Sequence, residues 1–436
     1  MSVGAWREES RRFDSPKRSR IGLSKVDLPL LAGGLYAMSL PLEGVVRVPG
    51  LGTGSYLAGV LFAAALGLQI LARGRVARPG RVALLYCALT AWWCTSLLWS
   101  HDPALTLLRL RLPVMLALVA LCLDQVAQRP RGSIALVRAY VVGAGFSASV
   151  VLYNAARGET YRDVPGFISR RGAVGLADRF TSGDIDPNSL GLALTIALFL
   201  GSNSRTEFSP PQRVVVSGLL LPAVVLTGSR GAMLALLVAA VVSGIGLLRG
   251  GGLSLGRRVR AVGLLAALGL VVGNYVLSTP RFSAALADPG AQAFSRTRIW
   301  AAAWRGFGDS PILGLGYFAV GTATAAAGLG YRAVHNAYLT LLFEGGVVAA
   351  ALGLLLVGTV YQRCRALRSP GLTGAATAIA VGALSLELLE RKYVVFVLVV
   401  LGAWEYSAGA RYPIRAPRDS VRAGLIPPMN AGGIAE

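Results

Sequence analysis

The chain has few charged residues and almost no histidine. Only 15% of its 436 residues are Asp, Glu, Lys or Arg, whereas 54% are hydrophobic and two are histidine. In soluble domains about a quarter of all residues are charged, so this low charged fraction excludes an ordinary soluble protein. Apolar runs long enough to cross hydrocarbon recur from end to end of the sequence. In hydrocarbon, the backbone N–H and C=O groups of each crossing segment must form hydrogen bonds within that segment, as they do in a helix. The sequence therefore predicts an all-α polytopic membrane protein.

Cysteine and acidic residues are also scarce. The four cysteines, Cys87, Cys94, Cys122 and Cys364, fall within apolar runs or on the expected inner side, so we expect no disulfide and no metal cluster. The net charge of +22 would suggest a nucleic-acid partner in a soluble protein. Here most of the excess lies in short segments between apolar runs, where the positive-inside rule and anionic lipid explain it. No nucleic-acid partner is expected.

Twelve apolar runs are expected to cross the membrane. Basic residues gather in every second connecting segment, such as "RGRVARPGR" at 73–81, which places those segments and the N-terminus in the cytoplasm. No small-residue cleavage site follows the first run, so we expect an uncleaved span rather than a signal peptide. An even number of crossings returns the basic C-terminus to the same side. The expected spans are residues 26–45, 53–72, 82–99, 106–123, 134–153, 187–202, 213–228, 231–248, 260–278, 336–361, 372–388 and 392–408.

This topology leaves two long segments on the outer face, 154–186 and 279–335. Loops of this length in a compact protein are typically functional. Part of the second, 296–307, has the length and residues of a short helix that ends at Gly-Asp-Ser-Pro. The expected organisation is a cytoplasmic tail (1–25), a transmembrane catalytic domain (26–408) and a second cytoplasmic tail (409–436).

The outer segments contain arginines that the positive-inside rule does not explain. Arg230 lies in a tight turn between two spans and has no acidic residue near it in the sequence. Guanidinium groups stay charged and bind phosphate oxygens in bidentate pairs, so this surface favours a diphosphate ligand. Pairing with outer carboxylates or lipid headgroups is the alternative role for any one loop arginine. The two long segments contain Arg157, Arg162, Arg170, Arg171 and Arg179, and Arg281, Arg296, Arg298, Arg305 and Arg332.

His335 lies in "RAVHNAYLTLLFEGG" at 332–346, on the outer face next to an apolar run. An interfacial hydrogen-bonding role is one interpretation, but a neutral imidazole can also accept a proton from a sugar hydroxyl. With arginines that neutralise a departing diphosphate, this predicts an inverting glycosyl transfer. Asn336 would orient the ring or the donor. The sequence has no His/Asp/Glu cluster with metal-ligand spacing, so neither a metal nor another cofactor is expected.

Five stretches in order along residues 90–350 resemble the O-antigen ligase and O-antigen polymerase superfamily. The stretch "HNAYLTLLFEGGVVA" resembles the signature His-[Asn/Ser/Gln]-x9-Gly-x-x-[Gly/Thr/Tyr], except that Ala349 stands at its last position. "LTGSRGAMLAL" resembles the Ser-Arg-Gly turn and carries Arg230, while "SRTRIWAAAW…DSPILGLGYF" carries Arg296 and Gly314. "DIDPNSLGLAL" resembles the Asp-Pro-Asn entry to a middle span, and "TSLLWSHDPALTL" the short outer loop after the third span.

The resemblance implies a GT-C-like fold in the bacterial inner membrane, with both termini cytoplasmic and a periplasmic active site. The donor would be an undecaprenyl-diphosphate-linked glycan. His335 would deprotonate the acceptor hydroxyl, and Arg230 and Arg296 would bind and stabilise the departing diphosphate. The other residues expected to bind substrate are Asn336, Arg298, Arg305, Arg179, Asn188 and Arg332.

Two acceptors are consistent with this resemblance. A lipid A-core sugar would make the protein a ligase of lipopolysaccharide biosynthesis, which is the leading prediction. A second lipid-linked glycan would make it an O-antigen or exopolysaccharide polymerase. A transporter or flippase is a weaker alternative, because such proteins place ionisable groups near the middle of the membrane and these apolar runs have few there.

Overall fold

The computed structural model describes residues 27–48, 52–161, 179–249, 254–278 and 289–404. The two expected cytoplasmic tails lie outside these residues. So do four of the outer arginines, Arg162, Arg170, Arg171 and Arg281.

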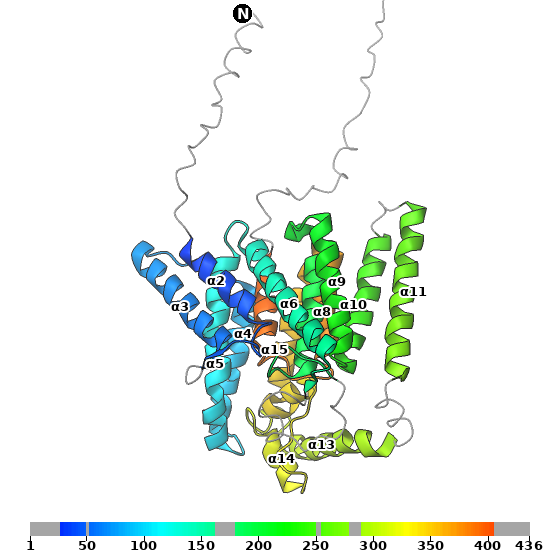
Figure 1. The fold of residues 1–436 in the computed structure, drawn as a ribbon. Helices are drawn as coiled ribbons and strands as arrows, with labels where there is room; N and C mark the ends of the chain where they lie inside the picture. Colours follow the sequence, from blue (N-terminus) through cyan, green and yellow to red (C-terminus); the bar gives the residue numbers. More distant parts are fainter. Residues whose placement is uncertain (1–26, 49–51, 162–178, 250–253, 279–288, 405–436) are drawn as a thin grey trace, which may run out of the picture.

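Helices that run side by side in one bundle make up most of the described chain (Figure 1). Each of the twelve expected spans coincides with one of them. Among the described residues, six helices are long and apolar enough to cross a membrane, and shorter apolar helices lie among them. The prediction of an all-α polytopic membrane protein is thus confirmed. The bundle helices are α2 (Leu28–Ser39), α3 (Gly54–Arg73), α4 (Arg81–Thr95), α5 (Pro103–Ala127), α6 (Gly132–Arg157), α8 (Pro187–Ser202), α9 (Pro210–Leu226), α10 (Arg230–Arg249), α11 (Leu255–Ser278), α15 (Ala337–Ala366), α16 (Pro370–Gly382) and α17 (Lys392–Gly402).

Two of these helices end earlier than their apolar runs predict. Helix α2 ends at Ser39 and is followed by turns and a small antiparallel hairpin of β1 (Arg47–Val48) and β2 (Gly52–Thr53). Helix α16 ends at Gly382, so residues 383–391 form an irregular connection to α17. Ala383, Leu386, Leu388 and Leu389 of this connection are buried by protein. Non-helical backbone is tolerated at membrane depth where protein covers it in this way.

Helix α17 lies in the centre of the bundle. All its residues from Tyr393 to Gly402 are buried, and it packs against α4, α5, α6 and α15. A helix that is apolar on every side suits a protein core or a membrane, and here protein covers it on every side. Because residues 383–391 lead directly into α17, this connection is fixed to the core of the bundle.

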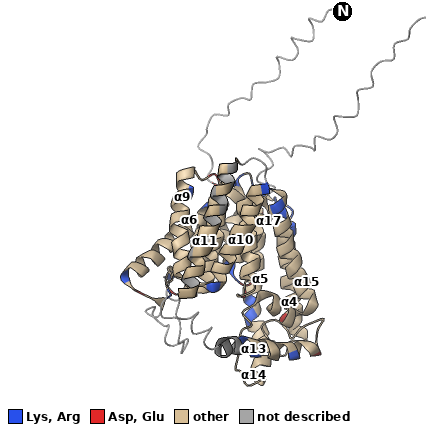
Figure 2. Ribbon diagram, turned by 90° about the vertical axis from the view of Figure 1, so that its right-hand side faces the viewer, with Lys and Arg blue, Asp and Glu red and all other residues tan. Residues whose placement is uncertain are grey.

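Two further helices lie across one end of the bundle (Figure 1). Helix α13 (Pro289–Asp309) runs roughly at right angles to the spanning helices, and α14 (Val320–Ala326) lies beside it. The helix expected over 296–307 is therefore present but begins seven residues earlier and ends two later. Lys and Arg concentrate toward the two ends of the bundle and are rare in its middle (Figure 2), as the positive-inside rule and the outer arginines require.

Candidate functional site

The candidate site is built around a break in α15. Gly346 has φ 67° and ψ −166°, so the helix is interrupted there. The backbone of residues 311–316 runs alongside the break: Leu315 N–H donates to Phe343 O (2.8 Å) and Val347 N–H donates to Pro311 O (3.0 Å). These bonds replace those that the interruption removes, which is necessary because unsatisfied backbone groups are costly in a membrane protein.

Two glycines from separate motifs meet at this break. A Cβ on Gly314 would lie 2.5 Å from Gly346 N, and a Cβ on Gly346 would lie 2.0 Å from Ile312 O. Both glycines also have φ near +70°. Glycine is required where backbones approach this closely and φ is positive. The stretches "DSPILGLGYF" and "HNAYLTLLFEGG" are therefore two halves of one packing unit.

A third motif holds the same segment from the other side. Tyr317 N–H donates to Ser96 Oγ (3.0 Å), and Thr106 Oγ1 donates to Tyr317 O (2.7 Å). His101 N–H donates to Leu315 O (3.0 Å). The stretch "TSLLWSHDPALTL" thus anchors the segment that supports α15.

His335 lies just before α15 in the left-handed region, with φ 53°, and its side chain is exposed. The indole Nε1 of Trp300, on α13, donates to the carbonyl of Val334 (3.0 Å). On its other side the His335 N–H donates to Glu387 Oε1 (3.3 Å). The histidine is therefore held between α13 and residues 383–391.

Asn336 caps α15. Its Oδ1 accepts hydrogen bonds from the backbone N–H of Tyr338 and Leu339, both at 3.1 Å. Ala337 N–H donates to Ala383 O (2.8 Å). The amide oxygen of the buried Asn336 thus caps the start of the helix. These bonds also fix the backbone next to His335.

Arg230 is the first residue of α10 and is exposed. The turn before it is capped by Ser229, whose Oγ accepts from Ala232 N–H (3.2 Å). A Cβ on Gly231 would lie 2.2 Å from Ser385 Oγ, so this turn packs against residues 383–391. Arg230 and His335 therefore flank the same connection, at residues only two positions apart in it.

Arg296 lies on α13 one turn before Trp300 and is exposed. Residues four apart share a helix flank, so Arg296 lies on the side of α13 that reaches the residue before His335. Arg298 and Arg305 are seven residues apart and share a different flank, about 140–160° around the helix from Trp300 at ~100° per residue. The structure thus places Arg296, but not Arg298 and Arg305, on the histidine's side of α13.

Comparison with known protein families gives a match, which includes Arg230, Arg296 and His335. Residues 215–354 match the family model described as O-antigen ligase. This match confirms the resemblance to the O-antigen ligase and polymerase superfamily, whose members are membrane glycosyltransferases. No curated protein sequence matches the chain.

The matched region contains Arg230, Arg296 and His335, whereas Arg179 and Asn188 lie outside it. Arg179 is buried; its Nε donates to Thr227 O (2.8 Å) and one terminal nitrogen donates to Asn188 Oδ1 (2.8 Å). Thr227 precedes the turn that carries Arg230. These contacts favour a role for Arg179 and Asn188 in positioning that turn.

Arg332 lies within the matched region, three residues before His335, and is exposed. Its Nε donates to Leu329 O (3.3 Å), and its N–H donates to Thr324 Oγ1 (3.1 Å). These bonds fold the 324–332 loop onto the end of α14. Arg332 therefore remains a candidate for binding substrate at the rim of the site.

Sequence reasoning did not identify an acidic group beside the domain's histidine. Glu387 contacts the His335 backbone, and Glu390 lies near the hydroxyl of Tyr317. Burial, reinforced by the charge of Glu387, raises the pKa of Glu390 to about 7. The Arg109 guanidinium lies 4.4 Å from the ring of Phe318, and its charge acts in the opposite direction on Glu390. No local motif marks these acidic residues.

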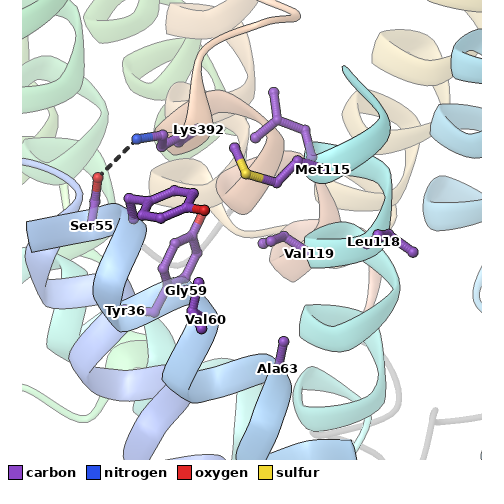
Figure 3. Close-up of a pocket in the computed structure, with 11 residues that line it drawn as sticks. Tyr36, Ser55, Gly59, Val60, Ala63, Met115, Leu118, Val119 and Lys392 are labelled. Atoms are coloured by element: carbon purple, nitrogen blue, oxygen red, sulfur yellow. Dashed lines mark hydrogen bonds between the residues drawn. The ribbon is translucent and has the colours of Figure 1, made fainter. Parts of the chain in front are cut away.

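An apolar groove adjoins the same connection at Lys392 (Figure 3). Lys392 Nζ donates to Glu43 Oε1 (2.5 Å) and Ser55 Oγ (3.0 Å), which makes one end of the groove polar. The remaining lining comes from apolar residues of α2, α3 and α5, including Val60 and Leu118, both of which are exposed on the side of the bundle. This groove has the character that a lipid chain requires.

Proposed function

We propose that the protein is an O-antigen ligase-type glycosyltransferase. It transfers a glycan from undecaprenyl diphosphate to a lipid A-core sugar on the periplasmic face of the inner membrane. One observation carries the proposal: the turn with Arg230 and the segment with His335 flank the connection 383–391, at Ser385 and Glu387. The connection thereby holds Arg230, which would bind the diphosphate, and His335, which would deprotonate the hydroxyl, on its two sides.

The reaction needs one proton acceptor and one anion-binding group. The imidazole of His335 accepts the proton of the acceptor hydroxyl, and the resulting oxygen attacks the anomeric carbon of the donor sugar. The bond from that carbon to the diphosphate breaks, and configuration inverts because attack comes from the opposite side. Arg230 and Arg296 bind the departing diphosphate, whose negative charge grows as the bond breaks.

The position of the site supports a substrate anchored in the membrane. His335 and Arg230 are exposed beside the connection 383–391, and the apolar groove adjoins the same connection at Lys392. An isoprenoid chain can therefore stay in an apolar environment while its diphosphate meets arginine. A transporter would instead place its ionisable groups near mid-membrane.

Deleting the gene and analysing the surface glycans on a gel tests the proposal. We expect loss of all polymer attached to the lipid A-core. A band with a single repeat attached would identify a polymerase instead. An unchanged glycan profile would exclude both activities.

Replacing Arg230 with lysine is expected to lower transfer about 10- to 100-fold. Lysine keeps the charge but loses bidentate binding, and one charge-assisted hydrogen bond contributes about 1.5–3 kcal/mol. The measurement is glycan transfer in membranes that contain equal amounts of each protein. Arg157→Lys is the control, because Arg157 is exposed and paired with Glu159 at 2.7 Å. Wild-type activity of Arg230→Lys would show that bidentate binding by Arg230 does not contribute to transfer.

Transfer is expected to continue in EDTA, because the proposed mechanism relies on arginine rather than a divalent cation to neutralise the diphosphate. The assay compares initial rates of transfer by purified protein before and after dialysis against the chelator. A loss of activity that Mg²⁺ or Mn²⁺ restores would show that arginine alone does not stabilise the leaving group.

A further inference from the structure

A cavity with a polar wall lies at the end of the bundle opposite the candidate site. It is about 820 Å³ in volume and lies between α10, α15 and the start of α16. Arg249 comes from the last turn of α10, Arg365 from the last turn of α15, and Arg368 from the turn after α15. Three cations from two segments that are far apart in the sequence thus converge on one concavity. The proposed glycan transfer uses none of them.

Within the residues that the structure describes, no carboxylate neutralises these arginines. In the described parts of the chain, the ion pairs involve other residues, and none of the three arginines has an acidic partner. The guanidinium of Arg365 lies 6.0 Å from the centre of the Tyr361 ring. The positive-inside rule accounts for the sign and side of these charges, but it requires only solvated charges near the ends of spans. It does not account for their convergence in a cavity.

The walls of the cavity are fixed by hydrogen bonds between helices. Ser243 Oγ, on α10, donates to Pro370 O at the start of α16 (2.9 Å). Ser369 is buried and bonds to Asn203 Oδ1 (3.1 Å). The cavity is therefore preformed, as binding sites for small ligands commonly are.

The wall formed by α10 continues from Arg249 into apolar residues. Gly246, Ile245 and Val242 line the cavity, and Ile245 is 41% exposed. Because α10 is long and apolar enough to cross the membrane, this wall faces hydrocarbon while the arginines face the headgroup region. A ligand that fits has a phosphate at one end and an acyl chain at the other.

We propose that this cavity binds an anionic phospholipid of the inner leaflet, its phosphates on Arg249, Arg365 and Arg368 and one acyl chain along α10. Basic cavities between spanning helices on the cytoplasmic side recognise such headgroups. A lipid with two phosphates, such as cardiolipin, matches the charge of three arginines best. The bound lipid would join α10 to α15 and α16.

The test measures binding of cardiolipin to the purified full-length protein in detergent, by native mass spectrometry and by thermal shift. The variant carries Arg249→Gln, Arg365→Gln and Arg368→Asn; asparagine suits the φ of 49° at residue 368. We expect binding to weaken about 100-fold. The control variant, Arg73→Gln with Arg75→Gln and Arg78→Gln, removes three exposed arginines from the same side and is expected to bind normally.

Several outcomes would overturn the proposal. Equal cardiolipin binding by both triple variants would show that the general positive charge of this side, and not the cavity, attracts the lipid. Zwitterionic phosphatidylethanolamine binding as tightly as cardiolipin would show that the phosphate charge is not recognised. A thermal shift from millimolar inorganic phosphate as large as that from cardiolipin would assign the cavity to a soluble anion. If the triple variant fails to fold, Arg365→Gln alone is compared with Arg73→Gln in the same assay.

Discussion

Replacing His335 with alanine is expected to abolish glycan transfer while the folded protein remains in the membrane. The loss of a general base lowers rates about 10²- to 10⁴-fold. The fold should persist, because the side chain is exposed and the bonds that fix this segment come from the backbone. The measurement is polymer attached per unit of membrane-inserted protein, from a glycan gel and an immunoblot of the same membranes.

The choice of substitution and control sharpens this test. Since His335 has φ 53°, His335→Asn is the less strained variant: asparagine tolerates the left-handed region but is not a base near neutral pH. The control is His101→Ala, because His101 is the other histidine of the chain, is exposed, and forms its hydrogen bond to Leu315 through its backbone. If both His335 variants retained the activity of His101→Ala, the imidazole would not be the base.

The sequence predicted the spans well because hydropathy is a strong local signal, and it failed where that signal is ambiguous. Residues 383–391 contain enough leucine and alanine to extend an apolar run, yet they are not helical. Burial in protein and burial in lipid select the same residue types, so composition alone does not separate them. The irregular connection that joins the two halves of the candidate site was therefore predicted as the end of a span.

The candidate site was predictable where a residue was unusual and unpredictable where its role depends on distant partners. His335 is rare by type, and Arg230 stands alone in a short turn, so each could be found directly. The sequence did not reveal that Arg179 forms a hydrogen bond with Thr227, which is 48 residues away. Glu387 reaches His335 across 52 residues. Such contacts depend on packing between helices, which no local pattern records.

Replacing Gly346 with alanine is expected to remove most folded, active protein. Its φ and ψ fall in a region that is essentially restricted to glycine and costs other residues about 1–3 kcal/mol. The new Cβ would also lie 2.0 Å from Ile312 O, a backbone atom that cannot move without breaking the Val347–Pro311 bond beside it. The measurement is the yield and melting temperature of detergent-purified protein, together with transfer activity.

Gly358→Ala is the matched control for Gly346→Ala, because it lies in the same helix, has helical geometry and has no atom within 4 Å of the added Cβ. Alanine is favoured there by about 1 kcal/mol, so this variant should be at least as stable as the wild type. Equal stability of both variants would mean that the break does not depend on glycine. The break at Gly346 also accounts for the spacing between His335 and Gly346.

The nine residues from Ala337 to Gly345 form a rigid helical piece about 13 Å long, which sets the distance from the histidine to the point where residues 311–316 cross α15. A glycine one position earlier or later would turn the crossing segment to another side of the helix, away from the residues that anchor it.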